Sequence, residues 1–173
     1  GANVNKNGEL TGIAQYRGMF GDRIRVSVDG AQINGAGPNA MDAPLHYAPV
    51  AILESLTINR GIVPVSKGQE TIGGYVEADT YAGDFGSNSE FKFSGRAYAG
   101  AQSVNSGDVL SGFFSVANDT HIFRGFVMQE SADDLEFPDG KITPSEYDRE
   151  RFDLGYSYAK GPHEFRIDFA RNN

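Results

Sequence analysis

Residues 35–80 read GAGPNAMDAPLHYAPVAILESLTINRGIVPVSKGQETIGGYVEADT, and this stretch decides how the rest of the chain is interpreted. Its pattern predicts a loop, a short helical turn beginning near Pro49, an alternating strand over residues 55–59 and a last strand over residues 75–80. Just before it, residues 23–28 alternate as a strand. Asp29-Gly30 then supplies the positive φ angles that a tight two-residue hairpin turn needs, and a second hairpin strand over residues 32–34 enters the loop.

This order of elements closely resembles the second half of the plug domain of TonB-dependent outer-membrane receptors. The residues that carry the resemblance are VDG at 28–30, ILESLTINRG at 52–61 and IGGYVEA at 72–78, and the match covers residues 22–80 almost continuously. In that family a plug closes the lumen of a barrel of about 22 strands. The resemblance implies that residues 1–82 are the C-terminal part of a plug domain. We therefore expect the earlier half of the plug, with the segment that contacts TonB, to be absent here.

The composition favours a β-rich chain and excludes several other classes. Twenty-two glycines and twenty Phe plus Tyr residues are typical of strands separated by tight turns. A formal net charge of −8 argues against a nucleic-acid partner, which needs clustered Lys and Arg. The chain has no cysteine, so it has no disulfide and no thiolate site. We read residues 1–8 as loop and residues 9–16 as a further strand, without the features of a signal peptide.

From residue 88 onward the sequence changes to period-two strands separated by turns. We predict strands over residues 90–101, 108–117, 121–130, 151–158 and 163–171, with a long polar loop over residues 131–148. The fold class that follows is mainly β: half of a plug, then residues 83–173 as the first five antiparallel strands of a transmembrane β-barrel. Five strands cannot close a barrel, since even the smallest bacterial barrels need about eight. We therefore interpret the chain as a fragment, while the strands alone would also suit a soluble sandwich.

Alternation along the strands predicts which face of the sheet meets lipid. Short inner turns, longer outer loops and aromatic residues gathered near the inner strand ends are the outer-membrane pattern. A slip of one residue would move every charge into hydrocarbon. We expect two faces: a lipid face with Phe91, Phe93, Tyr156, Tyr158, Phe165, Ile167 and Phe169, and a lumen face with Lys92, Arg96, Arg151, Asp153, Arg166 and Asp168.

No catalytic pattern is present, so we predict that the protein is not an enzyme. Residues 35–40 fit a loose G-x-G-x-x-A pattern, but Pro38 and the polar residues after it favour a loop over a dinucleotide site. Residues 139–146 match the second half of a calcium-binding loop. The first ligand positions of such a loop would fall on Leu135 and Phe137, whose side chains cannot bind calcium. A solvated acidic loop is favoured there, and a weak calcium site remains the alternative, with the ligands Asp133, Asp134, Asp139 and Glu146.

The candidate substrate-binding residues lie in the plug loop and comprise Asn39, Met41, Asp42 and His46. A thioether and an imidazole are ligands that soft or borderline metals such as copper accept, which makes Met41 and His46 candidate metal ligands. The stretch GPNAMDAPLHY resembles the corresponding loop of the copper receptor subgroup, in which a Cys and a Met four residues later bind copper. Here Met41 is present but Gly37 occupies the Cys position. Packing for Met41 and hydrogen bonding for His46 are the alternatives.

Glu54 and Arg60 belong to the segment that most resembles the family. A charged residue at the end of a plug strand inside a barrel is costly unless it is paired. We therefore expect Arg60 to face a carboxylate, and we assign both residues to plug–barrel contact.

The resemblance implies a TonB-dependent transporter of the outer membrane. Its partners would be the TonB complex of the inner membrane, outer-membrane lipid and a small-molecule or metal substrate, taken up with energy from the proton gradient. The substrate class is a scarce nutrient such as copper, another metal or a metal chelate; copper would be cargo, and no cofactor is expected. The alternative from another class is a secreted or periplasmic β-rich binding module without transport activity.

Overall fold

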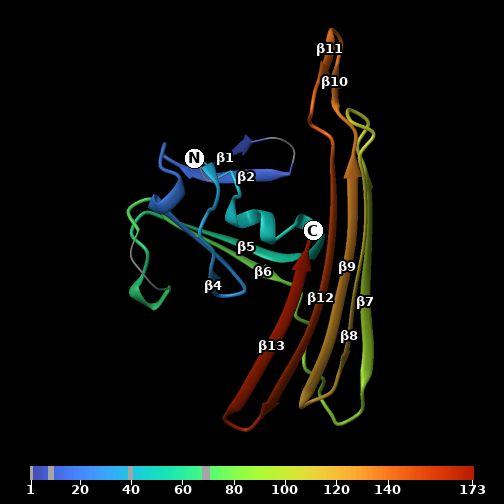
Figure 1. The fold of residues 1–173 in the computed structure, drawn as a ribbon. Coiled ribbons are helices and arrows are strands. Elements are labelled where there is room, and N and C mark those ends of the chain that lie inside the picture. The colour runs from blue at the N-terminus through green and yellow to red at the C-terminus, as the bar shows by residue number, and fades with distance from the viewer. Residues whose placement is uncertain (1, 8–9, 39–40, 68–70) are drawn as a thin grey trace. The chain divides into compact units, whose positions relative to one another are not determined.

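The computed structural model describes residues 2–7, 10–38, 41–67 and 71–173 (Figure 1). It is mainly β, with single turns of 3-10 helix between strands. The chain divides into two compact units, Gly1–Tyr81 and Ala82–Asn173, and each is described by itself. In the described parts, no helix is long and apolar enough to cross a membrane.

The first unit holds two small sheets. Strands β1 (Ala2–Asn7) and β2 (Thr11–Tyr16) form an antiparallel pair. The second sheet has the order β4-β3-β6-β5, with β3 at Ile24–Val28, β4 at Ala31–Gln32, β5 at Leu53–Arg60 and β6 at Gly74–Thr80. Strands β3 and β6 run parallel, and the other neighbours are antiparallel. The predicted strands from residue 9 to residue 80 are confirmed to within two residues at each end.

The prediction of a loop over residues 1–8 was wrong for β1. Its Asn-rich sequence disfavours a strand, but every residue from Ala2 to Asn7 faces a partner in β2. Pairing with a neighbouring strand outweighs intrinsic preference in such cases, because the ladder satisfies the backbone polar groups. Gly1 and Gly8, at the ends of the predicted loop, lie outside the described residues.

The core of the first unit lies on one face of the four-stranded sheet. Ile24 and Val26 of β3 pack with Tyr16 and Val76 in one buried cluster. Val28 packs with Ala48 and Ala78 in a second cluster. Leu45 packs against both clusters. Since Leu45 belongs to the 3-10 helix η3 (Pro44–Tyr47), this contact anchors the candidate loop to the sheet.

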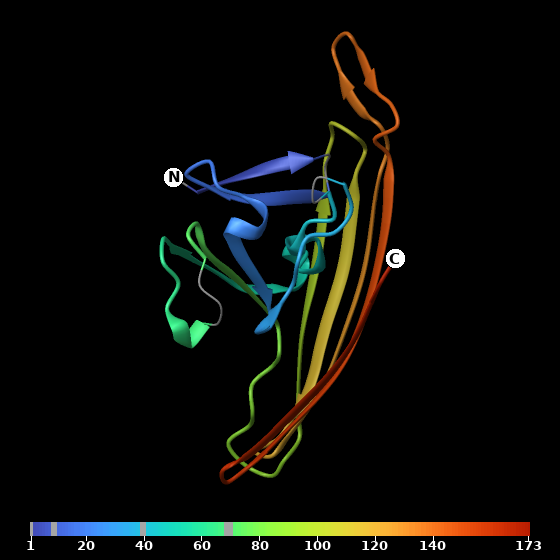
Figure 2. The ribbon, with the colours of Figure 1, turned by 60° about the vertical axis from the view of Figure 1, so that its left-hand side comes forward.

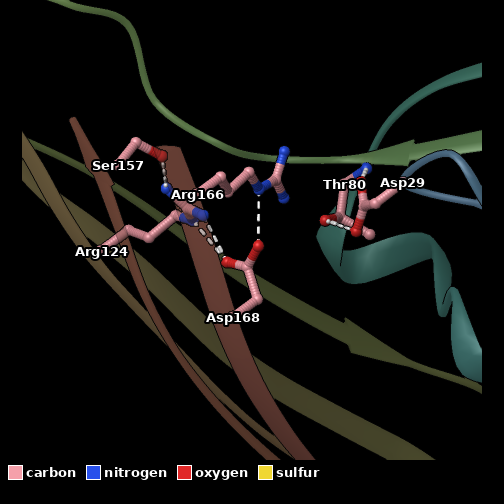
Figure 3. Close-up of polar contacts among 6 residues, drawn as sticks. All are labelled: Asp29, Thr80, Arg124, Ser157, Arg166 and Asp168. Carbon is pink, nitrogen blue, oxygen red and sulfur yellow. Dashed lines mark hydrogen bonds and ion pairs between the residues drawn. The ribbon is translucent and has the colours of Figure 1, made fainter. Parts of the chain in front are cut away.

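The turn between β3 and β4 also holds the far end of β6. Asp29 adopts a left-handed backbone with φ of 50°. One oxygen of its carboxylate accepts a hydrogen bond from the Thr80 backbone N–H at 2.8 Å, and the other accepts one from the Thr80 hydroxyl at 2.7 Å (Figure 3). The Asp29 N–H donates to the carbonyl of Ala78 at 2.9 Å. One side chain therefore joins the hairpin turn to the last residue of β6.

The second unit is built on an antiparallel sheet with the order β13-β12-β9-β8-β7 (Figure 2). All five predicted strands are confirmed, at Lys92–Ala101 (β7), Asp108–Ala117 (β8), His121–Ala132 (β9), Tyr147–Lys160 (β12) and His163–Asn172 (β13). The prediction of a polar loop over residues 131–148 was incomplete. This segment contains a hairpin of β10 (Leu135–Phe137) and β11 (Gly140–Ile142), whose strands of three residues are too short to show periodicity.

Alternation along β12 and β13 separates charged from apolar side chains, as predicted. Phe165, Ile167 and Phe169 are 54%, 58% and 59% exposed on one face of β13. Arg166 and Asp168 lie between them in sequence and therefore on the other face. The shared face of the charges is confirmed by the hydrogen bonds that Asp168 accepts from Arg166 and Arg124.

The Arg124 side chain on β9 reaches across β12 to its partner Asp168 on β13. Its Nη1 donates to the Ser157 hydroxyl at 2.8 Å, and its Nε donates to Asp168 at 3.1 Å (Figure 3). Gly155 stands directly opposite Arg124 on β9 and directly opposite Asp168 on β13. A Cβ atom at Gly155 would collide with the Arg124 guanidinium and with the Asp168 carboxylate. The absence of a side chain at this position therefore leaves the space through which the ion pair forms.

Gly155→Ala is expected to destabilise the protein by about 1–3 kcal/mol, the usual range for overpacking. The added methyl can be accommodated only by separating the ion pair, and the Arg124 side chain is only 5% exposed. Gly112→Ala is the matched control, because the nearest atom to its added Cβ is Val127 Cγ2 at 3.8 Å, an ordinary contact. Thermal unfolding of the full-length protein measures both variants. Equal midpoints for the two variants would contradict the role assigned to Gly155.

Asp29→Ala is expected to cost about 1–3 kcal/mol, because it leaves the Thr80 N–H and hydroxyl without their acceptor and places Ala in a left-handed backbone. Thr80→Val removes the hydroxyl bond alone and should cost less. Denaturant unfolding of both variants, followed by limited proteolysis of the first unit, gives the comparison. A Thr80→Val variant as unstable as Asp29→Ala would show that the backbone bond contributes nothing.

Candidate substrate-binding loop

The candidate loop is closed by its own backbone. Ala36 and Asp42 form an isolated antiparallel bridge, in which each N–H donates to the other's carbonyl at 3.0 Å. The Met41 N–H donates to the Pro38 carbonyl at 3.2 Å. Gly37 has a φ of 74°, in the left-handed region that favours glycine. These bonds make a tight apex, and the predicted substrate-binding residue Asn39 lies outside the described residues.

Met41 presents its side chain to solvent at the foot of this apex. It is 53% exposed, whereas apolar side chains that pack the unit are buried. Exposure of a thioether is unusual for a packing role and leaves the sulfur accessible to a ligand. The structure therefore weakens the packing alternative for Met41.

Asp42 and Tyr47 are joined across the end of the loop. The Tyr47 hydroxyl donates to Asp42 Oδ2 at 2.8 Å. This hydrogen bond, with smaller contributions from burial and from the negative charge of Asp42, raises the pKa of the Tyr47 phenol above its ordinary value. The Asp42 carboxylate is therefore engaged within the loop. The contact of Tyr47 with Asp42 could not be predicted from the sequence, because a spacing of five residues follows neither the helix nor the strand period.

His46 lies in η3, next to the engaged tyrosine. Its ring meets the Tyr47 ring edge-on, with centroids 5.7 Å apart and planes at 81°. The side chain is half-buried. The described residues contain no group of three or more His, Cys, Asp or Glu able to hold a metal ion. The donors that the loop offers to a soft metal are therefore the Met41 thioether and the His46 imidazole.

A cavity of about 440 Å³ lies beside the loop within the first unit. Gly35, Ala43 and Pro44 line it from the loop. Polar groups of Asp22, Asn34 and Thr71 share the lining with Ile13, Ile24 and Ile33. This volume falls within the range of about 300–1,000 Å³ that is common for small-ligand sites. The sequence did not predict it, because its walls come from five separate segments.

Glu54 and Arg60 both lie on β5 with exposed side chains. Their assignment to plug–barrel contact stays a prediction.

In the second unit, the carboxylate of Asp134, a ligand in the calcium alternative, closes the base of the β10–β11 hairpin. It accepts hydrogen bonds from the Ser145 N–H at 2.6 Å and the Glu146 N–H at 3.1 Å. The Ser145 amide is the main reason why the pKa of Asp134 is lowered.

Comparison with known proteins supports the predicted resemblance. The family model described as "TonB-dependent Receptor Plug Domain" matches residues 1–75. Receptors of this family sit in the outer membrane and are transporters, not enzymes. The match confirms the predicted resemblance to the family and its outer-membrane location, and the prediction that the protein is not an enzyme agrees with the family.

One solved structure resembles nearly the whole chain. The chain is similar to a protein described as "Copper transporter OprC", with 25% sequence identity and a TM-score of 0.87 over 99% of the chain. The chain spans only 26% of that transporter's length. Comparison with curated protein sequences gave no significant match.

Asp42→Asn is expected to lower the pKa of Tyr47 towards its ordinary value of about 10, because the amide removes both the hydrogen-bonding carboxylate and its charge. The raised pKa means that the Asp42–Tyr47 bond stabilises the loop at all pH values below about 10, and this stability is lost as the pH rises through the raised pKa. Ultraviolet titration of phenolate absorbance measures the shift, and Tyr47→Phe identifies which titration belongs to Tyr47. Identical curves for wild type and Asp42→Asn would contradict the contact.

Proposed function

We propose that this chain is part of an outer-membrane transporter that takes up copper, or another soft metal ion, with energy delivered through the TonB complex. The observation that carries the proposal is the similarity to a copper transporter over 99% of the chain. The exposed thioether of Met41 at the apex of the plug loop supports it independently. The match of residues 1–75 to a receptor plug domain favours this proposal over the alternative of a secreted or periplasmic binding module.

The chemistry of the loop favours Cu(I) over Cu(II). Thioether sulfur is a soft ligand that suits Cu(I), and the His46 imidazole is accepted by several transition metals. Asn39 and Asp42 offer harder oxygen donors to the same substrate. Gly37 replaces the anionic thiolate that the copper subgroup uses, so no negative sulfur neutralises the charge of the metal. We therefore propose weaker and more transient binding than a thiolate site gives.

The remaining assignments follow from the same reading. Residues 1–82 act as the plug, and residues 83–173 supply the first strands of the barrel. Phe165, Ile167 and Phe169 face lipid, because burying the charges of the opposite face in hydrocarbon would cost about 2–4 kcal/mol for each Arg near the midplane. Glu54 and Arg60 hold the plug to the barrel wall, and the TonB complex pulls on the plug to open a path.

Met41→Ala is expected to reduce Cu(I) affinity of the purified full-length receptor at least tenfold, and His46→Ala to reduce it less, because sulfur is the softer donor. Isothermal titration with Cu(I) and Cu(II) under anaerobic conditions measures both. Met19→Ala is the matched control, since Met19 is the other methionine of the first unit and lies at a β-bridge with Tyr16, outside the loop sequence. Unchanged Cu(I) binding in Met41→Ala and His46→Ala would remove the loop from the metal proposal.

Gly37→Cys adds a gain-of-function arm to the same titration. A cysteine at this position restores a thiolate four residues before Met41 and should tighten Cu(I) binding. The left-handed backbone of Gly37 makes the substitution cost about 1–2 kcal/mol in stability. Space is available, since the nearest atom to the added Cβ is the Asp42 backbone nitrogen at 4.0 Å.

A further inference from the structure

One end of the five-stranded sheet carries a cluster of rings that includes a histidine. His121 Nδ1 and the Tyr156 hydroxyl are hydrogen-bonded at 2.9 Å. The His121 ring stacks on Phe91 at 6.5 Å and lies 5.4 Å from the ring of Tyr158. Phe123 and Tyr156 extend the cluster with centroids 4.9 Å apart. These rings form a continuous aromatic surface across β9 and β12, reaching Phe91 next to β7.

Two basic side chains continue this surface at the turn between β12 and β13. Lys160 lies two residues after Tyr158, so both project from the same face of β12. His163 stands directly opposite Lys160 in the strand register. Phe165, the next residue on that face of β13, stands opposite Tyr158. The aromatic surface therefore ends in an exposed Lys–His pair, which we call the basic turn.

The basic turn differs from most cations of the second unit. Arg124, Arg149 and Arg151 are each bonded to a carboxylate, and so are Lys141 and Arg166. Within the described residues, Lys160 and His163 form neither a side-chain hydrogen bond nor an ion pair, although the chain carries a net charge of −8. The excess of carboxylates makes the unpaired Lys160 on an apolar face notable. Its charge is available to an anion from outside the chain.

We propose that the basic turn binds the phosphate of an anionic phospholipid, whose acyl chains lie along Phe165 and the aromatic surface. This inference rests on the proposed function, because it needs this face of the sheet to meet lipid. The Lys160 ammonium would supply the charge and donors for the phosphodiester, and His163 would add a second donor. Tyrosine rings at the headgroup level and lysine side chains that reach towards the interface suit this position.

The two parts of the site together select a lipid over a soluble anion. The phosphate needs the cations, and the apolar rings next to them offer nothing to inorganic phosphate. A lipid satisfies both, since its tails cover Phe165 while its headgroup meets Lys160. Short turns of outer-membrane strands lie at the periplasmic side, so the ligand belongs to the inner leaflet, where phospholipids are the natural occupants.

The test uses the full-length receptor in nanodiscs made from equal parts of phosphatidylglycerol and phosphatidylcholine. Native mass spectrometry after mild detergent release counts the lipids retained by the protein. Wild type is expected to retain phosphatidylglycerol preferentially, and Lys160→Gln with His163→Gln to reduce that preference about fivefold, since one cation near an anionic surface contributes about that factor. Lys141→Gln, with the same charge change on the exposed β11 strand, should leave the preference unchanged.

Three other outcomes overturn the inference in distinguishable ways. Equal retention of both lipids by wild type removes the site and leaves the transporter proposal intact. Loss of the preference on adding millimolar glycerophosphate would mean a plain phosphate site and not a lipid site. Failure of the receptor to insert into nanodiscs would overturn the membrane placement of the sheet and, with it, the proposed function.

Discussion

The structure depends on the requirement that backbone polar groups find partners while side chains alternate between two faces. In the second unit each strand is bonded to its neighbours, and this pairing fixes which residues stand opposite one another. The row Arg124, Gly155 and Asp168 follows directly from that register. Shifting one strand by a residue would break the ion pair and expose its charges on the apolar face. The Arg124–Asp168 ion pair and the separation of charged from apolar faces therefore favour the same strand register.

Much of this arrangement could be predicted because period two is visible in the sequence. The strand containing Phe165, Ile167 and Phe169 alternates so regularly that both its extent and the separation of its two faces were predicted correctly. The hairpin turn at Asp29-Gly30 was equally visible, since few residue pairs suit its backbone. β1 was missed because its Asn-rich sequence is typical of loops, and only its pairing with β2 makes it a strand. The β10–β11 hairpin was missed because three residues are too few to show a period.

The candidate site was predicted less completely than the fold. Residue types suggested Met41 and His46 as candidate ligands, which stays a prediction, and nothing in the spacing indicated that Tyr47 is hydrogen-bonded to the carboxylate of Asp42. The cavity beside the loop is formed by segments between residues 13 and 71, so its existence depends on tertiary structure. The same holds for the role of Gly155, which is defined by side chains on two other strands. Contacts of this kind have no local signature.

The loop chemistry fits the proposed role in transport. A carrier must bind its cargo firmly enough to capture it and weakly enough to release it. An anionic thiolate beside the thioether would hold Cu(I) tightly, and its release would then need a larger rearrangement of the plug. With Gly37 in that position, the Met41 thioether and the His46 imidazole carry no negative charge, and one oxygen of the Asp42 carboxylate already accepts a hydrogen bond from Tyr47. Capture would then rest mainly on Met41, and a modest movement of the closed apex would suffice to let the metal go.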